Sequence, residues 1–167
     1  MNILKTSILN STADVLVISA HPSLLAGSGI SGIIHKAAGP ELEKYAKPLG
    51  PLKAGEAVIT PAFNLNAKYI IHTICPRYMD GQRGEAEQLA SAYSSALAFY
   101  NQVPDAKSIS FVSMGTGVYK WPLELAADIA TRELLKSRFE ETFLCVMDEP
   151  TKDAYEFALD KAINKNK

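Results

Sequence analysis

The sequence predicts an α/β protein in which helices cover both faces of a central β-sheet. Short runs rich in β-branched residues alternate with longer segments of helical period, which is typical of layered α/β architecture. Two of these runs, 15–19 and 69–74, are apolar on both alternating faces, as strands buried between helices are. A chain of 167 residues with 47% hydrophobic residues can bury such a core, and we expect one domain spanning residues 1–167.

Strands and helices are expected to follow one another along most of the chain. The segments with the β-branched and aromatic composition of strands are 3–8, 14–20, 57–61, 69–74, 108–113 and 143–147. A helix is expected over 33–38, and another over 84–103, where apolar residues recur with a period of 3.6. A third should begin at Trp121-Pro122, because proline is tolerated in a first turn, and the last near Lys152.

Composition and charge exclude several classes of function. Seventeen basic and eighteen acidic residues give a formal net charge of −1, so the chain has no global positive field with which to hold nucleic acid. The longest apolar run, 15–20, is far shorter than the roughly 20 residues that cross a bilayer. We therefore expect a cytoplasmic protein that binds neither membrane nor nucleic acid.

The two cysteines lie in apolar, strand-like surroundings and cannot make the disulfide framework of a small secreted domain. Cys75 and Cys145 are expected to be buried free thiols; the alternative is a reactive thiol at Cys75, close to Arg77. The chain has no Cys-x-x-Cys motif and no histidine–carboxylate spacing typical of a metal site, and no G-x-S-x-G elbow of an acyl-transfer nucleophile. We expect no metal and no cofactor.

The first glycine-rich segment, 27–32, matches the pattern G-x-G-x-x-G and runs directly into the helix expected over 33–38. A dinucleotide fold is disfavoured, because six residues separate the preceding strand from Gly27 and no acidic residue ends a second strand about 20 residues on. The segment is still a candidate phosphate-binding turn, because glycines let a phosphate approach the backbone and the amino end of a helix favours an anion.

A second glycine-rich segment, Met114-Gly-Thr-Gly-Val-Tyr119, follows the strand expected over 108–113 and precedes Trp121-Pro122. Either segment alone is also compatible with a tight structural turn. Two such segments at the ends of sheet strands can enclose a diphosphate from both sides. Together they favour an anion-binding crevice.

At this point the chain resembles the macro domain family, whose members bind ADP-ribose. The resemblance extends from about residue 6 to residue 163 and rests on five motifs in order. These are Asp14-Val-Leu-Val17, the segment 23–42, Gly55-Glu-Ala-Val-Ile-Thr-Pro61, Tyr69-Ile-Ile-His-Thr73, and Gly115-Thr-Gly-Val-Tyr119 with Trp121-Pro122. The resemblance implies a three-layer α/β/α sandwich with a mixed, mostly parallel sheet of about six strands, and a ligand across the strand ends.

The resemblance also implies which residues contact the ligand. The first loop would wrap the diphosphate and the distal ribose, the second would close over the diphosphate, and Tyr119 would cover the distal ribose. The ligand-binding residues implied are Ser7, Ile8, Ala20, His21, Gly27, Ser28, Gly29, Ile30, Ser113, Gly115, Thr116, Gly117, Val118, Tyr119 and Met147.

Four positions depart from the family pattern. Ser7 stands where the family has an aspartate that accepts a bond from the adenine amino group, and Met147 stands where it has an aromatic residue against adenine. A neutral acceptor makes a weaker hydrogen bond than a carboxylate, so adenine selectivity should be weaker. Hydrolytic members read Asn-Ala-Ala-Asn where this chain has 18–21, and carry an aspartate where it has Ser31. The catalytic residues are therefore unknown, with His21 and Ser31 as weak candidates.

Three functions follow from this reading. The first is a binding module for ADP-ribose, free or attached to a protein, with the usual hydrolase residues missing. The second is a hydrolase of ADP-ribosylated substrates or O-acetyl-ADP-ribose that uses a non-standard water-activating group such as His21. The third is a module that has drifted toward another phosphorylated nucleotide, because Ser7 and Met147 both alter adenine recognition.

Overall fold

The computed structural model describes residues 1–115 and 119–165. In this part of the chain, the sheet at the centre of the protein has six strands. The strands are β1 (Asn2–Lys5), β2 (Val15–Ser19), β3 (Ala57–Pro61), β4 (Tyr69–Thr73), β5 (Ser108–Val112) and β6 (Glu141–Val146). Their order across the sheet is β1-β6-β5-β2-β4-β3. All neighbouring pairs are parallel except β3 with β4, so the sheet is mixed and mostly parallel, as predicted.

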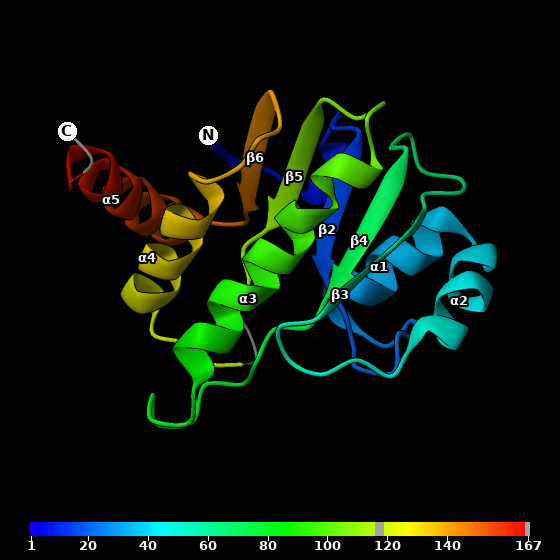
Figure 1. The fold of residues 1–167 in the computed structure, drawn as a ribbon, viewed down its shortest axis with the longest axis horizontal. Helices are drawn as coiled ribbons and strands as arrows, with labels where there is room; N and C mark the ends of the chain where they lie inside the picture. Colours follow the sequence, from blue (N-terminus) through cyan, green and yellow to red (C-terminus); the bar gives the residue numbers. More distant parts are fainter. Residues whose placement is uncertain (116–118, 166–167) are drawn as a thin grey trace.

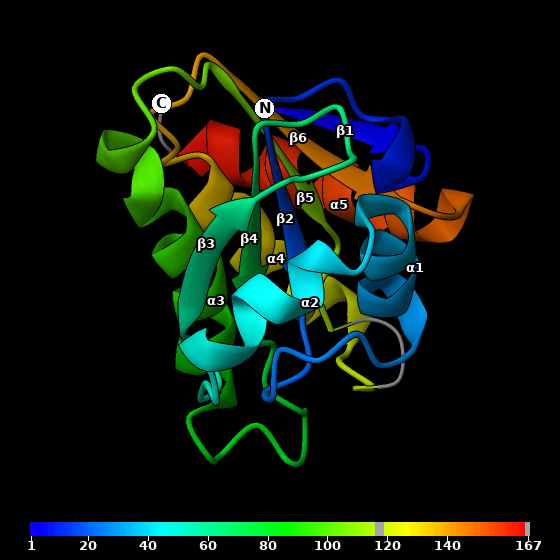
Figure 2. The same ribbon diagram turned by 90° about the vertical axis from the view of Figure 1, so that its right-hand side faces the viewer.

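The helices form a layer on each face of this sheet. They are α1 (Gly29–Ala38), α2 (Glu41–Ala46), α3 (Glu85–Leu97), α4 (Leu123–Leu134) and α5 (Glu149–Lys165), with 3-10 segments η1 (Ile8–Asn10), η2 (Lys47–Leu49) and η3 (Ala98–Gln102). Figure 1 shows α3, α4 and α5 on one side of the sheet and α1 and α2 on the other. Figure 2 shows the same layers turned by 90°, with α1 and α2 in front of the strands. The predicted three-layer α/β/α architecture is confirmed.

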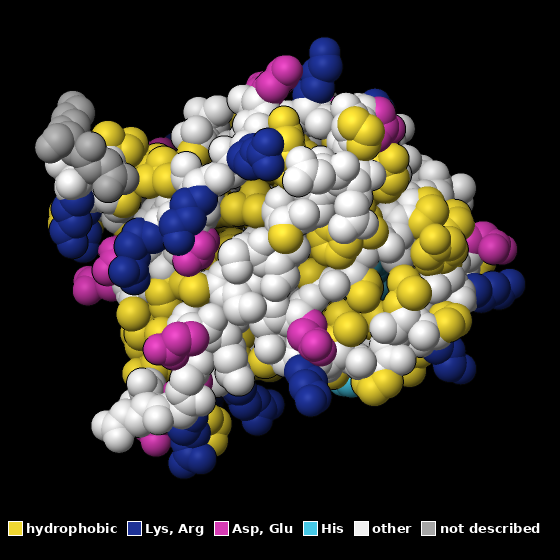
Figure 3. Space-filling model, viewed as in Figure 1, with side chains coloured by type: hydrophobic (Ala, Val, Ile, Leu, Met, Phe, Trp, Pro, Cys, Tyr) yellow, Lys and Arg dark blue, Asp and Glu magenta, His cyan; other side chains and the backbone are white. Residues whose placement is uncertain are grey.

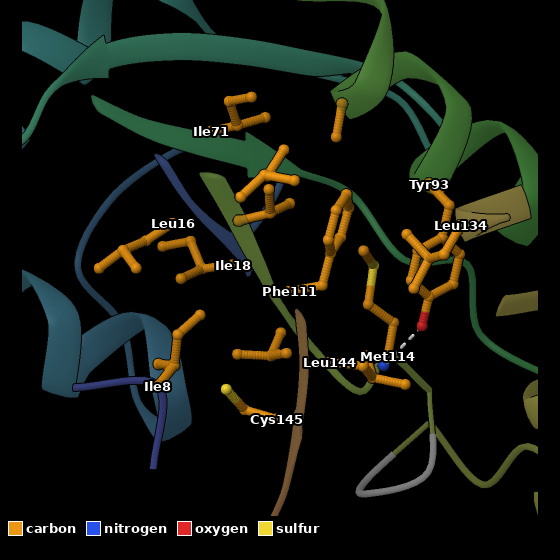
Figure 4. Close-up of a cluster of buried hydrophobic side chains, with 14 of the residues drawn as sticks. Ile8, Leu16, Ile18, Ile71, Tyr93, Phe111, Met114, Leu134, Leu144 and Cys145 are labelled. Carbon is orange, nitrogen blue, oxygen red and sulfur yellow. Dashed lines mark hydrogen bonds between the residues drawn. The ribbon is translucent and has the colours of Figure 1, made fainter. Parts of the chain in front are cut away.

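The core lies on both faces of β5, whose five residues are all buried. Figure 4 shows Phe111 of β5 among side chains of β2, β4 and the helices. The rings of Phe111 and Tyr93 lie 5.7 Å apart between centroids. Cys75 and Cys145 are buried free cysteines, and burial raises the pKa of the Cys75 thiol to about 12, which makes a reactive thiolate unfavourable at neutral pH.

Several element boundaries differ from the sequence predictions. The first strand ends at Lys5 instead of residue 8, because the side chain of Ser7 accepts the Leu9 N–H and begins η1. The last helix begins at Glu149, where the Asp148 carboxylate accepts the Thr151 N–H at 2.8 Å. The helix expected over 84–103 ends at Leu97 and continues as η3. Helix α2 was not expected.

No helix in the described part of the chain is both long and apolar enough to cross a membrane.

Candidate functional site

A hollow lies at the edge of the sheet where the adjacent parallel strands β2 and β5 end. Its volume is about 410 Å³. The residues that line it are Ser19, Ala20, His21, Ala26, Gly27, Ser28, Gly29, Ile30, Ser31, Ser113, Gly115 and Tyr119. The hollow, which we call the crevice, therefore has one wall from the segment after β2 and one from the segment after β5. This is the edge at which parallel α/β sheets bind ligands.

The first wall depends on three glycines with different roles. Gly27 and Gly29 have φ values of +62° and +67°, a conformation that favours glycine. Gly32, inside α1, lies so close to the loop that a Cβ there would be 2.7 Å from the Gly27 carbonyl oxygen. The glycine pattern thus folds the segment tightly onto the first turn of α1.

The amino end of α1 opens on the crevice. Ser28 is its N-cap, and no side chain of a described residue caps the helix there. The N–H groups of the first turn, at Gly29, Ile30 and Ser31, have no carbonyl partner within the helix. Since all three residues line the crevice, the helix presents amide donors and its positive dipole end to whatever binds there.

His21, at the start of the first wall, is exposed and held by its own loop. Its Nδ1 accepts the Ser23 N–H at 3.1 Å and lies 2.7 Å from the Ser23 hydroxyl, which accepts the Leu25 N–H. A ring nitrogen that accepts a backbone N–H is unprotonated, so the ring proton is on Nε2. His21 is therefore arranged as a hydrogen-bond donor through Nε2, because the lone pair of Nδ1 is engaged by Ser23.

Behind the first wall, a buried polar cluster joins α1 to β4. The Ser31 hydroxyl, both ring nitrogens of His35 and Nδ1 of His72 are buried with no hydrogen-bond partner among the described residues. Thr60 donates its hydroxyl proton to the Pro61 carbonyl and accepts from His72 Nε2 at 3.0 Å. Burial lowers the pKa of His72 to about 3 and also lowers that of His35, so both rings are neutral at pH 7.

The second wall is held from beneath by two tyrosines. The Met114 N–H donates to the Tyr93 hydroxyl of α3 at 3.1 Å, a bond drawn in Figure 4. The Ser113 hydroxyl donates to that of Tyr155, from α5, at 2.8 Å. A side-chain hydrogen bond also joins Tyr93 to Tyr155. Both tyrosines are fully buried, so the start of the second wall is tied to the core between sheet and helices.

A third segment, 76–78, supports the second wall from the side. The Trp121 indole donates to the Pro76 carbonyl at 2.8 Å, and the Tyr78 N–H donates to the Tyr119 carbonyl at 3.2 Å. The Arg77 guanidinium carbon lies 5.8 Å from the centroid of the Tyr119 ring. No sequence motif pointed to this segment, because its contacts join residues more than 40 positions apart.

Most of the residues implied by the sequence come together in the crevice, but some do not. Ser7, Ile8 and Met147 are not among its lining residues; Ile8 is buried and Met147 is 75% exposed. Ser7 and Met147 follow Thr6 and Val146, which are joined by a 3.0 Å backbone bond, so they share the edge of the sheet beyond the crevice. Thr116, Gly117 and Val118 lie outside the described residues.

Two lining residues, Ser19 and Ala26, were not expected. Ser19 is the last residue of β2, and Ala26 comes directly before the first glycine. Both are next to predicted ligand-binding residues in the sequence, and this position was the signal that could have identified them.

A larger hollow, of about 570 Å³, lies between α3, α4 and α5. Its rim carries both signs of charge, Glu87 and Glu133 with Arg132, Lys136 and Lys165, and Lys136 pairs with Glu133 at 3.2 Å. Figure 3 shows such dark blue and magenta side chains near the C-terminal helix. None of its described lining residues belongs to a glycine-rich segment.

The family model for the Macro domain matches residues 17–130. The chain belongs to the macro domain family. A macro domain-containing protein of Chlorobaculum tepidum is 39% identical over 161 residues, covering 93% of each chain. One from Ralstonia nicotianae is 38% identical over 161 residues, covering 95% of this chain and 94% of the other.

Solved macro domains share the fold. A mutant of the Oceanobacillus iheyensis macrodomain, solved with ADPR, superimposes with a TM-score of 0.89 at 34% identity, covering 97% of this macro domain and 92% of that chain. The same macrodomain with ADP also gives a TM-score of 0.89 at 34% identity, covering 98% and 91%. The Trypanosoma brucei macrodomain in complex with ADP gives 0.83 at 26% identity, covering 94% and 67%.

Proposed function

We propose that this macro domain binds ADP-ribose in the crevice between its two glycine-rich segments. The observation that carries the proposal is the amino end of α1, which no described side chain caps and whose first three residues line the crevice. A diphosphate there would accept hydrogen bonds from backbone amides and lie against the positive end of the helix dipole. The ADP-ribose and ADP in the solved relatives support this choice of ligand.

The other parts of the ligand follow from the two walls. Tyr119 offers a ring for the distal ribose, and the Nε2–H of His21 offers a donor to a ribose or phosphate oxygen. The adenine would lie toward Ser7 and Met147, past the edge of the crevice. With a hydroxyl and an exposed thioether in place of a carboxylate and a ring, adenine contributes less to affinity.

Binding without hydrolysis is the function we favour. None of the described lining residues is an aspartate or glutamate, and the hydroxyl of Ser31 is buried. The lone pair of His21 Nδ1 is engaged by Ser23, which leaves Nε2 a donor instead of a base. A hydrolase of ADP-ribosylated substrates or O-acetyl-ADP-ribose that used His21 as its base would need a free lone pair on Nε2, which requires the other tautomer and the loss of the Ser23 N–H bond.

Calorimetric titration tests the ligand. ADP-ribose should bind with a Kd around micromolar, worth about 8 kcal/mol, and more tightly than AMP, which lacks the diphosphate and the distal ribose. Gly29→Glu should abolish binding, because its side chain and charge enter the place of the diphosphate; there is open space around a Cβ at this position. No heat from the folded wild-type protein at millimolar ADP-ribose would overturn the proposal and favour another phosphorylated ligand.

His21→Asn separates the binder from the hydrolase. An asparagine side chain can accept a backbone N–H two residues ahead, as His21 Nδ1 does at Ser23, so the loop should keep its shape. We expect affinity for ADP-ribose within about threefold of wild type, and no release of ADP-ribose from a modified peptide by either protein. Turnover by wild type that is lost in His21→Asn would establish the hydrolase.

We further propose that the ligand includes ADP-ribose attached to a protein. If the distal ribose can carry a peptide, an ADP-ribosylated peptide should compete with free ADP-ribose in the same titration. Failure of the peptide to compete would restrict the ligand to the free nucleotide.

A further inference from the structure

The crevice lacks the positive charge that a diphosphate ligand calls for. None of its described lining residues is a lysine or an arginine, and the sequence has Thr, Gly and Val at 116–118. Backbone amides and the dipole of α1 offer only partial charges. A cation that balances the two negative charges of a diphosphate must therefore lie just outside the lining.

Arg77 is a cation in that place. Its guanidinium carbon is 5.8 Å from the centroid of the Tyr119 ring, and that ring lines the crevice. Arg77 is exposed and forms no ion pair with any residue in the described part of the chain. Arg83, six residues further along the same loop, is by contrast paired with Asp80 at 3.3 Å. The charge of Arg77 thus has no described carboxylate to neutralise it.

The backbone around Arg77 is anchored on both sides. The Trp121 indole donates to the Pro76 carbonyl, and the Tyr78 N–H donates to the Tyr119 carbonyl.

The loop that follows is organised by Glu85, whose buried carboxylate accepts N–H groups from Met79, Asp80, Gly81 and Arg83. These bonds lower the pKa of Glu85 to about 2, so it remains an acceptor at neutral pH.

We infer that Arg77 is the residue that selects anionic ligands at the crevice, by setting a full positive charge against the Tyr119 ring. This inference rests on the proposed function and deepens it. The guanidinium attracts the ligand phosphates through space, which raises the affinity for ADP-ribose at low ionic strength and is screened by salt. It also keeps the Tyr119 ring in place by a cation–π contact.

Titration of Arg77→Gln with ADP-ribose at low and high salt tests the inference. At about 20 mM NaCl the Kd should rise about fivefold, and at about 500 mM the difference should shrink to less than twofold, because salt screens the attraction between exposed charges. Arg77→Lys keeps the charge and should bind within about twofold of wild type.

Arg138→Gln is the matched control. Arg138 lies over the Tyr100 ring at 4.7 Å, the same pairing of side chains, but both residues precede the amino ends of β5 and β6, at the opposite edge of the sheet. This variant makes the same change in net charge and should leave the Kd unchanged.

The outcomes separate this inference from the proposed function. If wild type binds ADP-ribose and Arg77→Gln binds equally well, or is weakened no more than Arg138→Gln, Arg77 does not select the ligand. A loss that persists at high salt and is not rescued by Arg77→Lys would also overturn the electrostatic role, since it would reflect displaced packing at Tyr119. If wild type does not bind ADP-ribose, the proposed function fails and this inference fails with it.

Discussion

The two walls of the crevice are built in opposite ways. The first is shaped mainly by its own residues: Gly32 lies against the Gly27 carbonyl, and His21 bonds to Ser23 two positions ahead. The second depends on partners far away in the chain, with Tyr93 under Met114 and other contacts from α5 and segment 76–78. Substitutions in the first wall should therefore weaken ligand binding with little loss of stability. Substitutions in the second wall should lower the free energy of unfolding as well.

The largest effect is expected for Gly115→Ala in the second wall. Gly115 has a φ of +89°, and a Cβ there would lie 2.5 Å from Cδ1 of the Trp121 indole, which is buried and bonded to Pro76. Backbone strain and displacement of the indole should lower the free energy of unfolding by about 3 kcal/mol. Urea denaturation measures it.

Gly29→Ala is the matched change in the first wall. Gly29 has a similar φ of +67°, but a Cβ there meets no heavy atom within 4 Å, so only backbone strain of about 1 kcal/mol is expected. Equal losses in the Gly115 and Gly29 variants would contradict the contrast between the walls.

Acid should weaken the support of the first wall through His72. Its pKa is about 3 in the folded protein and near 6.5 when unfolded, so between these values the unfolded chain binds a proton that the folded protein does not. Stability is then lost as pH falls below 6.5, by about 1.4 kcal/mol per pH unit, or about 2 kcal/mol at pH 5. His35, whose pKa burial also lowers, acts in the same direction.

Denaturation at pH 7 and pH 5 tests this, with His72→Gln for comparison. The pKa of Glu85 is lowered to about 2, so its contribution is lost only as pH falls below about 4.5, outside this window. The Gln variant is expected to show a smaller loss between pH 7 and pH 5. An unchanged pH dependence would mean that the pKa of His72 is not lowered in the folded protein.

Tyr93→Phe should affect stability more than its small chemical change suggests. It removes the hydroxyl that accepts the Met114 N–H, leaving a buried donor without its partner, at a cost of about 1.5 kcal/mol. Affinity for ADP-ribose should fall with it, because Met114 begins the second wall. Tyr100→Phe, in η3 at the other edge of the sheet, should change stability by less than about 0.5 kcal/mol. Similar values for both variants would show that the Tyr93 bond contributes nothing.

The same contrast explains what could be predicted from the sequence. Strand positions and the first wall were predictable because alternating apolar runs and closely spaced glycines are local patterns. Helix α2 was missed because six residues after Gly39-Pro40 carry too short a periodic signal. The tyrosine pair and segment 76–78 were missed for a different reason: Tyr93 and Tyr155 read as ordinary apolar positions of helices, and only the folded sheet brings their hydroxyls under Ser113 and Met114.

The smallest effect on stability, and the sharpest test of the contrast, is expected for Glu43→Ala. Glu43 of α2 accepts the Ala26 N–H at 2.9 Å and is the first wall's contact with a helix beyond α1. Its loss should free the loop without opening the core, so the free energy of unfolding should fall by less than about 1 kcal/mol. The Kd for ADP-ribose should rise about fivefold, because the loop must then be ordered by the ligand.

Glu43→Gln keeps an acceptor oxygen for Ala26 and should restore most of the affinity. Glu41→Ala removes an exposed carboxylate of the same helix, one that faces Lys44 at 3.8 Å, and should change neither quantity. Calorimetry and urea denaturation on the three variants then give affinity and stability separately. Loss of a contact confined to the loop should not destabilise the core. If Glu43→Ala lowers the free energy of unfolding as much as Tyr93→Phe does, the first wall therefore unfolds as one cooperative unit with the second.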